Sequence, residues 1–197
     1  MKNLEKYFIK SKKIGFSHYK KEDAGIISDW INNPVINKYF THHLPSTKEK
    51  LEKAIVNISG GSSNIGFVVH DLKNGIAFGI LEIRNIDFIS KKCNLEIAIG
   101  LSNYLSKGYG SEIMLLAEKY IFEVLQLKKC RLHTCVENSQ MIGLAKKMGY
   151  KAEGILKDEL FIDGKYYDEV IFSKLVDKNR PGSLNHIASN VLGLVGN

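Results

Sequence analysis

The segment Leu105-Ser106-Lys107-Gly108-Tyr109-Gly110-Ser111-Glu112 decides the fold. It follows a strand-like run that ends at Gly100, and it opens a long amphipathic helical pattern. Its two glycines, Gly108 and Gly110, allow the backbone to approach a ligand closely because no Cβ intervenes. The helix behind them directs free N–H groups and the positive end of its dipole at that ligand. The segment therefore predicts a binding site for an anionic group such as a pyrophosphate.

Two common phosphate-binding motifs do not fit this segment. A P-loop requires Gly-Lys-Ser/Thr at its end, and the sequence contains no such run. A dinucleotide-binding fingerprint requires a third glycine where Ile113 stands, and Glu123 lies inside the helix instead of following it. The loop instead resembles the Arg/Gln-x-x-Gly-x-Gly/Ala signature of the GNAT family, the acetyl-CoA-dependent N-acetyltransferases. It departs from that signature at the first position, which is Leu105.

Three further segments resemble this family, in the family's order. One begins at Asn138 and closes with Lys147-Met148-Gly149-Tyr150, like the second GNAT signature. The other two resemble the branch that acetylates ribosomal-protein N-termini and diamines: Asp29-Trp30-Ile31-Asn32-Asn33-Pro34 and Asp163-Gly164-Lys165-Tyr166-Tyr167-Asp168. The resemblance runs from about Ile14 to about Val176, which is nearly the whole chain.

The resemblance implies an α/β (α+β) GNAT fold. Its central sheet is mixed, mostly antiparallel and twisted, has about seven strands flanked by helices, and splays in the middle, usually at a bulge, to admit acetyl-CoA. The hydrophobic pattern gives the same alternating order. It predicts strands over 14–18, 65–70, 76–83, 94–100 and 130–136, and a hairpin turn at Asn74-Gly75. Helices are predicted over 21–32, over 46–58 and from 109 onward. The second helix opens with a capping box from Ser46 to Glu49. The third carries a core stripe made of Ile113, Leu116, Ala117, Tyr120, Ile121 and Val124.

Composition indicates one catalytic domain. The chain has 197 residues, of which 44% are hydrophobic and 25% charged, and we place the domain at residues 1–178. No apolar run approaches the ~20 residues that span a bilayer, and no secretory h-region follows the N-terminus. Three cysteines without metal-ligand spacing indicate reduced thiols in a cytoplasmic protein and predict no metal site. Residues 179–197 form a tail with a short amphipathic pattern, which we expect to pack on the domain or on a sister subunit in a homodimer.

The net charge of +7 and the sequence pI near 9.2 predict attraction to anions. Coenzyme A carries several phosphate charges, and Lys107, Lys146 and Lys147 lie where they could serve it. Other lysines are scattered along the chain, some as pairs such as Lys12-Lys13 and Lys91-Lys92, and are not gathered with aromatic residues in one stripe. This pattern is typical of a solvated surface and disfavours nucleic acid as the partner.

The resemblance also implies which residues bind the cosubstrate. Backbone groups of Ile97, Ala98 and Ile99 would bind pantetheine, and an N–H there would face the oxyanion. Asn138 would bond the pantetheine amide or the adjoining strand, or would simply cap its helix. Lys147 could meet a phosphate. The pyrophosphate would be held by the N–H groups of Ser106, Lys107, Gly108, Tyr109, Gly110 and Ser111.

The catalytic groups are less defined by the sequence. Glu96 faces away from its strand neighbours and is either the base that accepts the amine proton or the partner of a Lys or Arg. Two other acidic residues near the expected opening of the acceptor pocket, Asp158 and Glu159, are alternatives, either as the base or as the charge that attracts a cationic amine. Many family members carry a tyrosine seven residues after the asparagine, and it acts as the general acid that protonates the thiolate. That position is Ala145 here. Ser139, Tyr109 or water would then protonate the thiolate.

The acceptor pocket is expected between the first two helices, their connection and the late strands. Candidates for its wall are Tyr39, Phe40, His42, His43 and Phe161. The predicted reaction is acetyl transfer to a primary amine by direct attack in a ternary complex. The amine is a protein N-terminus, a polyamine or an amino sugar, and the basic chain slightly favours a protein N-terminus or a nucleotide-linked amino sugar. A non-catalytic acyl-CoA-binding module and a basic nucleic-acid-binding protein are the alternative functions.

Overall fold

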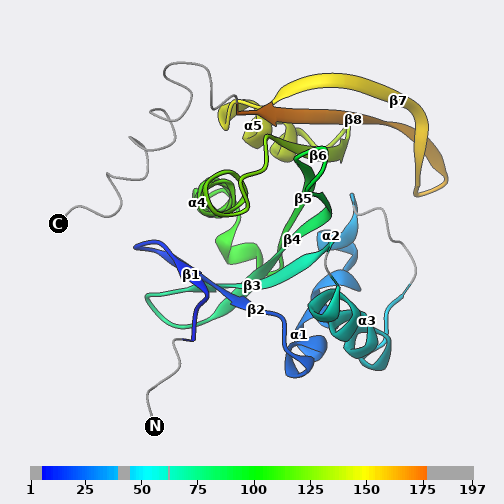
Figure 1. The fold of residues 1–197 in the computed structure, drawn as a ribbon. Coiled ribbons are helices and arrows are strands. Elements are labelled where there is room, and N and C mark those ends of the chain that lie inside the picture. The colour runs from blue at the N-terminus through cyan, green and yellow to red at the C-terminus, as the bar shows by residue number, and fades with distance from the viewer. Residues whose placement is uncertain (1–5, 40–44, 62, 177–197) are drawn as a thin grey trace, which may run out of the picture.

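The computed structural model describes residues 6–39, 45–61 and 63–176. Its described strands form one sheet in the order β1-β2-β3-β4-β5-β6-β8-β7 (Figure 1). Neighbouring strands are antiparallel except β5 and β6, which are parallel. The strands are β1 (Ile9–Lys10), β2 (Ile14–His18), β3 (Ile65–Asp71), β4 (Ala77–Asp87), β5 (Lys92–Ile99), β6 (Lys129–Cys135), β7 (Lys151–Ile162) and β8 (Lys165–Leu175).

Helices cover both faces of this sheet (Figure 1). Three of them lie on one face, which we call the α1/α3 face: α1 (Ala24–Ile31), α2 (Pro34–Asn37) and α3 (Lys48–Gly60). The opposite face, the α4 face, carries α4 (Tyr109–Lys119) and α5 (Ser139–Lys147). The main core lies between the sheet and α4, whereas a smaller cluster joins α1 and α3 to β3 and β4. Short helical turns, η1 (Lys21–Asp23) and η2 (Ser102–Tyr104), precede α1 and the glycine loop, and a π-helical stretch, η3 (Tyr120–Val124), continues α4.

The pairing of β5 with β6 ends early, although both strands continue. Only Lys92, Cys93 and Asn94 of β5 pair, and their partners are the first three residues of β6, the last of them Arg131. Beyond this point β5 remains paired with β4 up to Ile99, and β6 remains paired with β8 up to Cys135. We call the place where the β5–β6 ladder ends the sheet fork. It confirms the prediction of a sheet that splays in its middle.

The described structure confirms most of the predicted elements and corrects four details. An eighth strand, β1, was not predicted. The short helix α2, which begins at Pro34, was not predicted either, and Asn33 caps it by accepting from Val35 N. The cap of α3 is Thr47, whose Oγ1 accepts from Lys50 N, and not Ser46, whose backbone N–H instead donates to the Asn32 side chain.

The fourth correction concerns the predicted core stripe of the long helix. Val124 is 60% exposed, whereas Ile113, Ala117 and Ile121 are fully buried. Val124 lies in η3, and a π-helical turn holds more residues than an α-helical turn. The wider turn therefore rotates Val124 off the face that the α-helical spacing assigned to it.

A buried ion pair fastens the C-terminal end of α4 to β8. Lys174 Nζ lies 2.7 Å from Glu118 Oε2 and donates a second bond of 2.9 Å to the carbonyl oxygen of Met148 at the end of α5. The Glu118 side chain is 1% exposed. Burial raises the pKa of Glu118 and outweighs the opposing effect of Lys174. One lysine therefore connects both helices of the α4 face to the far half of the sheet.

Replacing Lys174 by Met should destabilise the fold by about 3–5 kcal/mol at neutral pH, because Glu118 would be left as a buried, unpaired charge. Lowering the pH should reduce this loss, since protonation of Glu118 removes the charge and a carboxyl whose pKa is raised by folding favours the folded state at low pH. Urea unfolding of both proteins at pH 5 and pH 7.5 measures the effect. An equal loss at the two pH values would contradict it.

Candidate active site

The glycine loop turns directly into α4. Gly108 precedes the helix with φ = +84°, a left-handed conformation in which glycine carries no Cβ penalty. The first helical bond runs from Glu112 N to the Gly108 carbonyl oxygen, at 3.2 Å. The N–H groups of Tyr109, Gly110 and Ser111 therefore have no acceptor one turn earlier in the helix. They present three donors at the positive end of α4.

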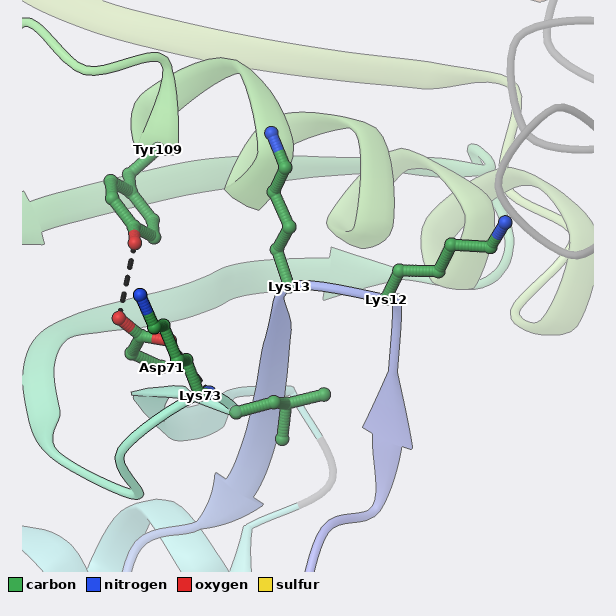
Figure 2. Close-up of a pocket in the computed structure, with 6 residues that line it drawn as sticks. Lys12, Lys13, Asp71, Lys73 and Tyr109 are labelled. Atoms are coloured by element: carbon green, nitrogen blue, oxygen red, sulfur yellow. Dashed lines mark hydrogen bonds between the residues drawn. The ribbon is translucent and has the colours of Figure 1, made fainter.

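Two hairpins hold the first turn of α4 in place (Figure 2). Asp71, at the end of β3, accepts hydrogen bonds from Tyr109 at 3.0 Å and from Tyr104 at 3.3 Å. In the turn between β1 and β2, Ser11 Oγ donates to Glu112 Oε1 at 2.7 Å. A pocket of about 320 Å³ lies between these hairpins and α4, and its lining includes three lysines: Lys12, Lys13 and Lys73. This arrangement adds positive charge beside the helix start.

The Tyr109 hydroxyl is directed at Asp71 and the β3–β4 hairpin (Figure 2). Burial, together with the hydrogen bond to Asp71, raises the pKa of Tyr109. A phenol that is held as a donor to a carboxylate is a poor source of a proton for a thiolate elsewhere. The geometry thus gives Tyr109 a role in positioning the loop and does not favour it as the general acid.

The sheet fork exposes one edge of β5 next to the glycine loop. Ile97, Ala98 and Ile99 pair with β4 in regular register, and their other edge faces the part of β6 that no longer pairs with β5. The expected bulge is not at this place, since the register shift between β4 and β5 lies at Arg84–Asp87, near the start of β5. The fork arises from the early end of the β5–β6 ladder. Backbone donors and acceptors on this edge are suited to an extended amide-containing chain.

Glu96 points to the α1/α3 face, as its alternation with Leu95 and Ile97 predicted. It pairs across the strands with Glu82, and Arg84 Nε lies 3.5 Å from Glu96 Oε2 and 2.6 Å from Glu82 Oε2. The Glu96 side chain remains 55% exposed. It therefore has an arginine neighbour and is also accessible at the fork. This geometry is compatible with both interpretations of Glu96, as an ion-pair partner and as a base.

Tyr19 completes this polar group from the other side. Its ring lies over Gly66 of β3, where an added Cβ would overlap it, and its hydroxyl donates to Glu82 Oε1 at 2.9 Å. Burial and the proximity of Glu82 raise the pKa of Tyr19 well above its ordinary value. Arg84, between two carboxylates, has its pKa raised by their charges, although burial acts against this. The cluster of Tyr19, Glu82, Arg84 and Glu96 thus brings one guanidinium and one phenol together with two carboxyl groups.

Sequence analysis did not identify His133, which lies on the other arm of the fork. Its Nδ1 is 3.1 Å from Glu169 Oε2 of β8, and the Glu169 side chain is 7% exposed. The sequence contained one signal, a histidine directly after the core residue Leu132 and therefore on the other face of its strand. Its partner Glu169 is 36 residues away, so only the folded sheet brings the two together.

The residues predicted on α5 lie at its two ends. Asn138 caps the helix, because its Oδ1 accepts from Met141 N at 3.1 Å, and Ser139 is the exposed first helical residue. Lys147 is exposed at the opposite end. Ala145 is fully buried in the main core. The cap interpretation of Asn138 is thus observed, and the position of the missing tyrosine lies within packed side chains.

The predicted acceptor wall is only partly within the described residues. Tyr39 packs against Leu160 and Ile162 and so joins the connection after α2 to the late strands. Phe161 is 55% exposed and contacts Tyr166 instead, on the other side of β7. Phe40, His42 and His43 lie outside the described residues, as does the tail. The alternative acids, Asp158 and Glu159, are on β7, which β6 and β8 separate from the fork.

Replacing Gly108 by Ala should weaken the binding of acetyl-CoA about tenfold, because a Cβ in the left-handed conformation costs ~1–2 kcal/mol and is relieved by moving the loop. Gly164→Ala is the matched control: Gly164 has φ = +79° in the β7–β8 turn, away from α4. Both variants should lose similar stability. Calorimetric titration with acetyl-CoA distinguishes them, and equal affinities would place the ligand elsewhere.

Comparison with known proteins agrees with this geometry. Residues 13–151 match the family model of the acetyltransferase (GNAT) domain. Spermidine N(1)-acetyltransferase of Vibrio cholerae is 28% identical over 149 residues, which is 76% of this chain and 85% of the relative. The Escherichia coli K12 protein of the same name is 27% identical over 151 residues, 77% of this chain and 80% of the relative.

Solved structures show the same fold. The crystal structure of spermidine N-acetyltransferase from Vibrio cholerae in complex with CoA and spermine superposes with a TM-score of 0.78 at 26% identity, covering 82% of this chain and 95% of that one. A dodecameric structure of spermidine N-acetyltransferase from that organism superposes with a TM-score of 0.72, also at 26% identity. The match covers 82% of this chain and 93% of that one. No helix within the described ranges is long and apolar enough to cross a membrane. The chain belongs to the GNAT acetyltransferase family and is an acetyl-CoA-dependent N-acetyltransferase.

Proposed function

We propose that the acceptor is a polyamine of the spermidine and spermine class, acetylated at a terminal amine. The observation that carries this proposal is a row of three carboxylates on the α1/α3 face, on both sides of the sheet fork: Glu82, Glu96 and Glu169. A polycation requires negative charge at its binding site. The spermidine acetyltransferases among the relatives support the same acceptor class.

Local charge and net charge point to different acceptors here. The chain is basic as a whole, and this favoured a protein N-terminus or a nucleotide-linked amino sugar. The lysines of the pocket beside α4 lie at the turns after β1 and β3, whereas the carboxylate row lies within the strands on the α1/α3 face. Positive charge would thus serve the phosphates of coenzyme A, and negative charge would attract the amine. Separation of the two charges allows one basic chain to bind an anionic and a cationic substrate.

The residues around the glycine loop fit coenzyme A. In the proposed complex, the N–H groups from Ser106 to Ser111 bind the pyrophosphate, and the open edge of β5 at Ile97–Ile99 binds the pantetheine amides. Acetyl-CoA supplies the thioester carbonyl that the amine attacks. An N–H on the β5 edge stabilises the oxyanion, a contribution worth a few kcal/mol when water is excluded. Asn138 and Lys147 are retained as further contacts of the cosubstrate, and Ser139 is retained as a candidate acid.

Glu96 is the proposed acceptor of a proton from the attacking nitrogen. It is exposed at the fork, and Arg84 Nε lies 3.5 Å from its Oε2. An ionised carboxylate can receive a proton directly or through one water molecule. Self-association is part of the proposal as well, since the edge strand β7 exposes Ile155 and Phe161.

Spermidine and spermine should be acetylated with a higher kcat/KM than an N-terminal peptide or an amino sugar, as measured by thiol release with acetyl-CoA. Glu96→Gln should lower kcat/KM for spermidine about 10²-fold and leave acetyl-CoA affinity nearly unchanged. Glu123→Gln is the control, because Glu123 is exposed on η3, on the α4 side. Full activity of Glu96→Gln would exclude Glu96 as the base, and preference for the peptide would refute the polyamine assignment.

A further inference from the structure

Acetylation of an ammonium group requires two proton transfers from the same nitrogen. The reactant R–NH₃⁺ becomes R–NH–acetyl, while the C–S bond breaks and the sulfur leaves as a thiolate. One proton must end on that sulfur, and the other must reach solvent. Glu96 accounts for one of these protons. The position of the usual acidic tyrosine is the buried Ala145, so the other proton needs a second group.

The register of the sheet places Glu96 and His133 at equivalent positions just beyond the end of the β5–β6 ladder. Asn94 and Arg131 are the last paired residues of β5 and β6, and Glu96 and His133 each follow two positions later on parallel strands. Leu95 and Leu132 both belong to the main core on the α4 face. Because side chains alternate along a strand, Glu96 and His133 both point to the α1/α3 face, one from each arm of the fork.

Glu169 determines how the His133 ring can act. A carboxylate only accepts hydrogen bonds. In the contact of 3.1 Å, the ring therefore carries a proton on Nδ1 and donates it to Glu169 Oε2 as a hydrogen bond. In the neutral ring, Nε2 is then the basic nitrogen. Glu169 is nearly buried, whereas the His133 side chain is 33% exposed. A buried carboxylate behind a partly exposed imidazole is the arrangement that orients a histidine for proton transfer.

We propose that His133 is a catalytic residue that takes a proton from the acceptor nitrogen at Nε2 and returns it to the coenzyme A thiolate. This inference rests on the proposed function. The nitrogen's other proton passes to Glu96 and then to solvent, so that R–NH₃⁺ and acetyl-CoA give the acetamide, coenzyme A thiol and one released proton. Glu169 is a positioning residue, because it acts through His133. On the described α1/α3 face, Glu169 contacts the ring, Arg131 and Cys135 flank His133 two positions away on β6, and Glu96 lies on the same face of β5.

The central test compares His133→Gln with His18→Gln, a matched control at the exposed end of β2, outside the fork. With acetyl-CoA and spermidine, His133→Gln should lower kcat roughly 10²- to 10³-fold while the KM for acetyl-CoA stays within about threefold. Glu169→Gln should lower kcat about tenfold with the same unchanged KM. Activity of His133→Gln within threefold of the wild type would overturn the proposal.

A second measurement does not depend on the acceptor. Diethyl pyrocarbonate modifies neutral imidazole, and peptide mass spectrometry reports the modification of each histidine. Coenzyme A should protect His133 and leave His18 reactive. If the wild-type protein acetylates no amine but coenzyme A protects His133, the proposed acceptor class fails and the placement of His133 at the fork stands. If coenzyme A leaves His133 as reactive as before, the catalytic role of His133 is overturned.

Discussion

The early end of the β5–β6 ladder is the constraint on which the rest of the structure depends. Unpaired N–H and C=O groups in the middle of a sheet are costly unless something bonds them. The three pairs at Lys92–Asn94 hold the two halves of the sheet together at one end, and beyond them the strands are free to receive an extended ligand. The centre of the proposed site lies around this fork: the β5 edge, the glycine loop after it, Glu96 on one arm and His133 on the other.

Maintaining the fork requires that both halves of the sheet be fixed independently. On the β4–β5 side, Asp71 connects the β3–β4 hairpin to the start of α4 through two tyrosine hydroxyls. On the β6–β8 side, the buried pair of Glu118 and Lys174 connects α4 to β8. Helix α4 therefore bridges the two halves on one face of the sheet. The carboxylate row lies on the opposite face, which also carries the apolar cluster beneath α1 and α3.

The sequence predicted the fold well because its signals were local. The glycine loop, the alternation from Leu95 to Ile99 and the Asn74-Gly75 turn each depend on neighbouring residues, and all three were confirmed. Features that depend on pairing between distant segments were missed. The short strand β1 is defined only by its partner β2, and the π-helical turn that moves Val124 off the core face leaves no signature in apolar spacing.

The site shows the same division. The direction of Glu96 followed from its strand, but its contact with Arg84 and the role of Tyr19 required the register of three strands. His133 could not be found from spacing, because only the parallel register of β5 and β6 places it at the position equivalent to Glu96 beyond the ladder, and its partner Glu169 is on β8. The preference for a peptide or nucleotide-sugar acceptor came from the net charge, which contains no information on where the carboxylates and lysines lie.

Hydrogen exchange with and without acetyl-CoA tests the central claim most directly, because it reports on backbone amides at the fork itself. Protection should increase in peptides that cover residues 95–111, which contain the open edge of β5 and the glycine loop. Peptides from β2, at the far side of the sheet, should exchange as before. Unchanged exchange over 95–111 at saturating acetyl-CoA would contradict the assignment of the fork as the cosubstrate site.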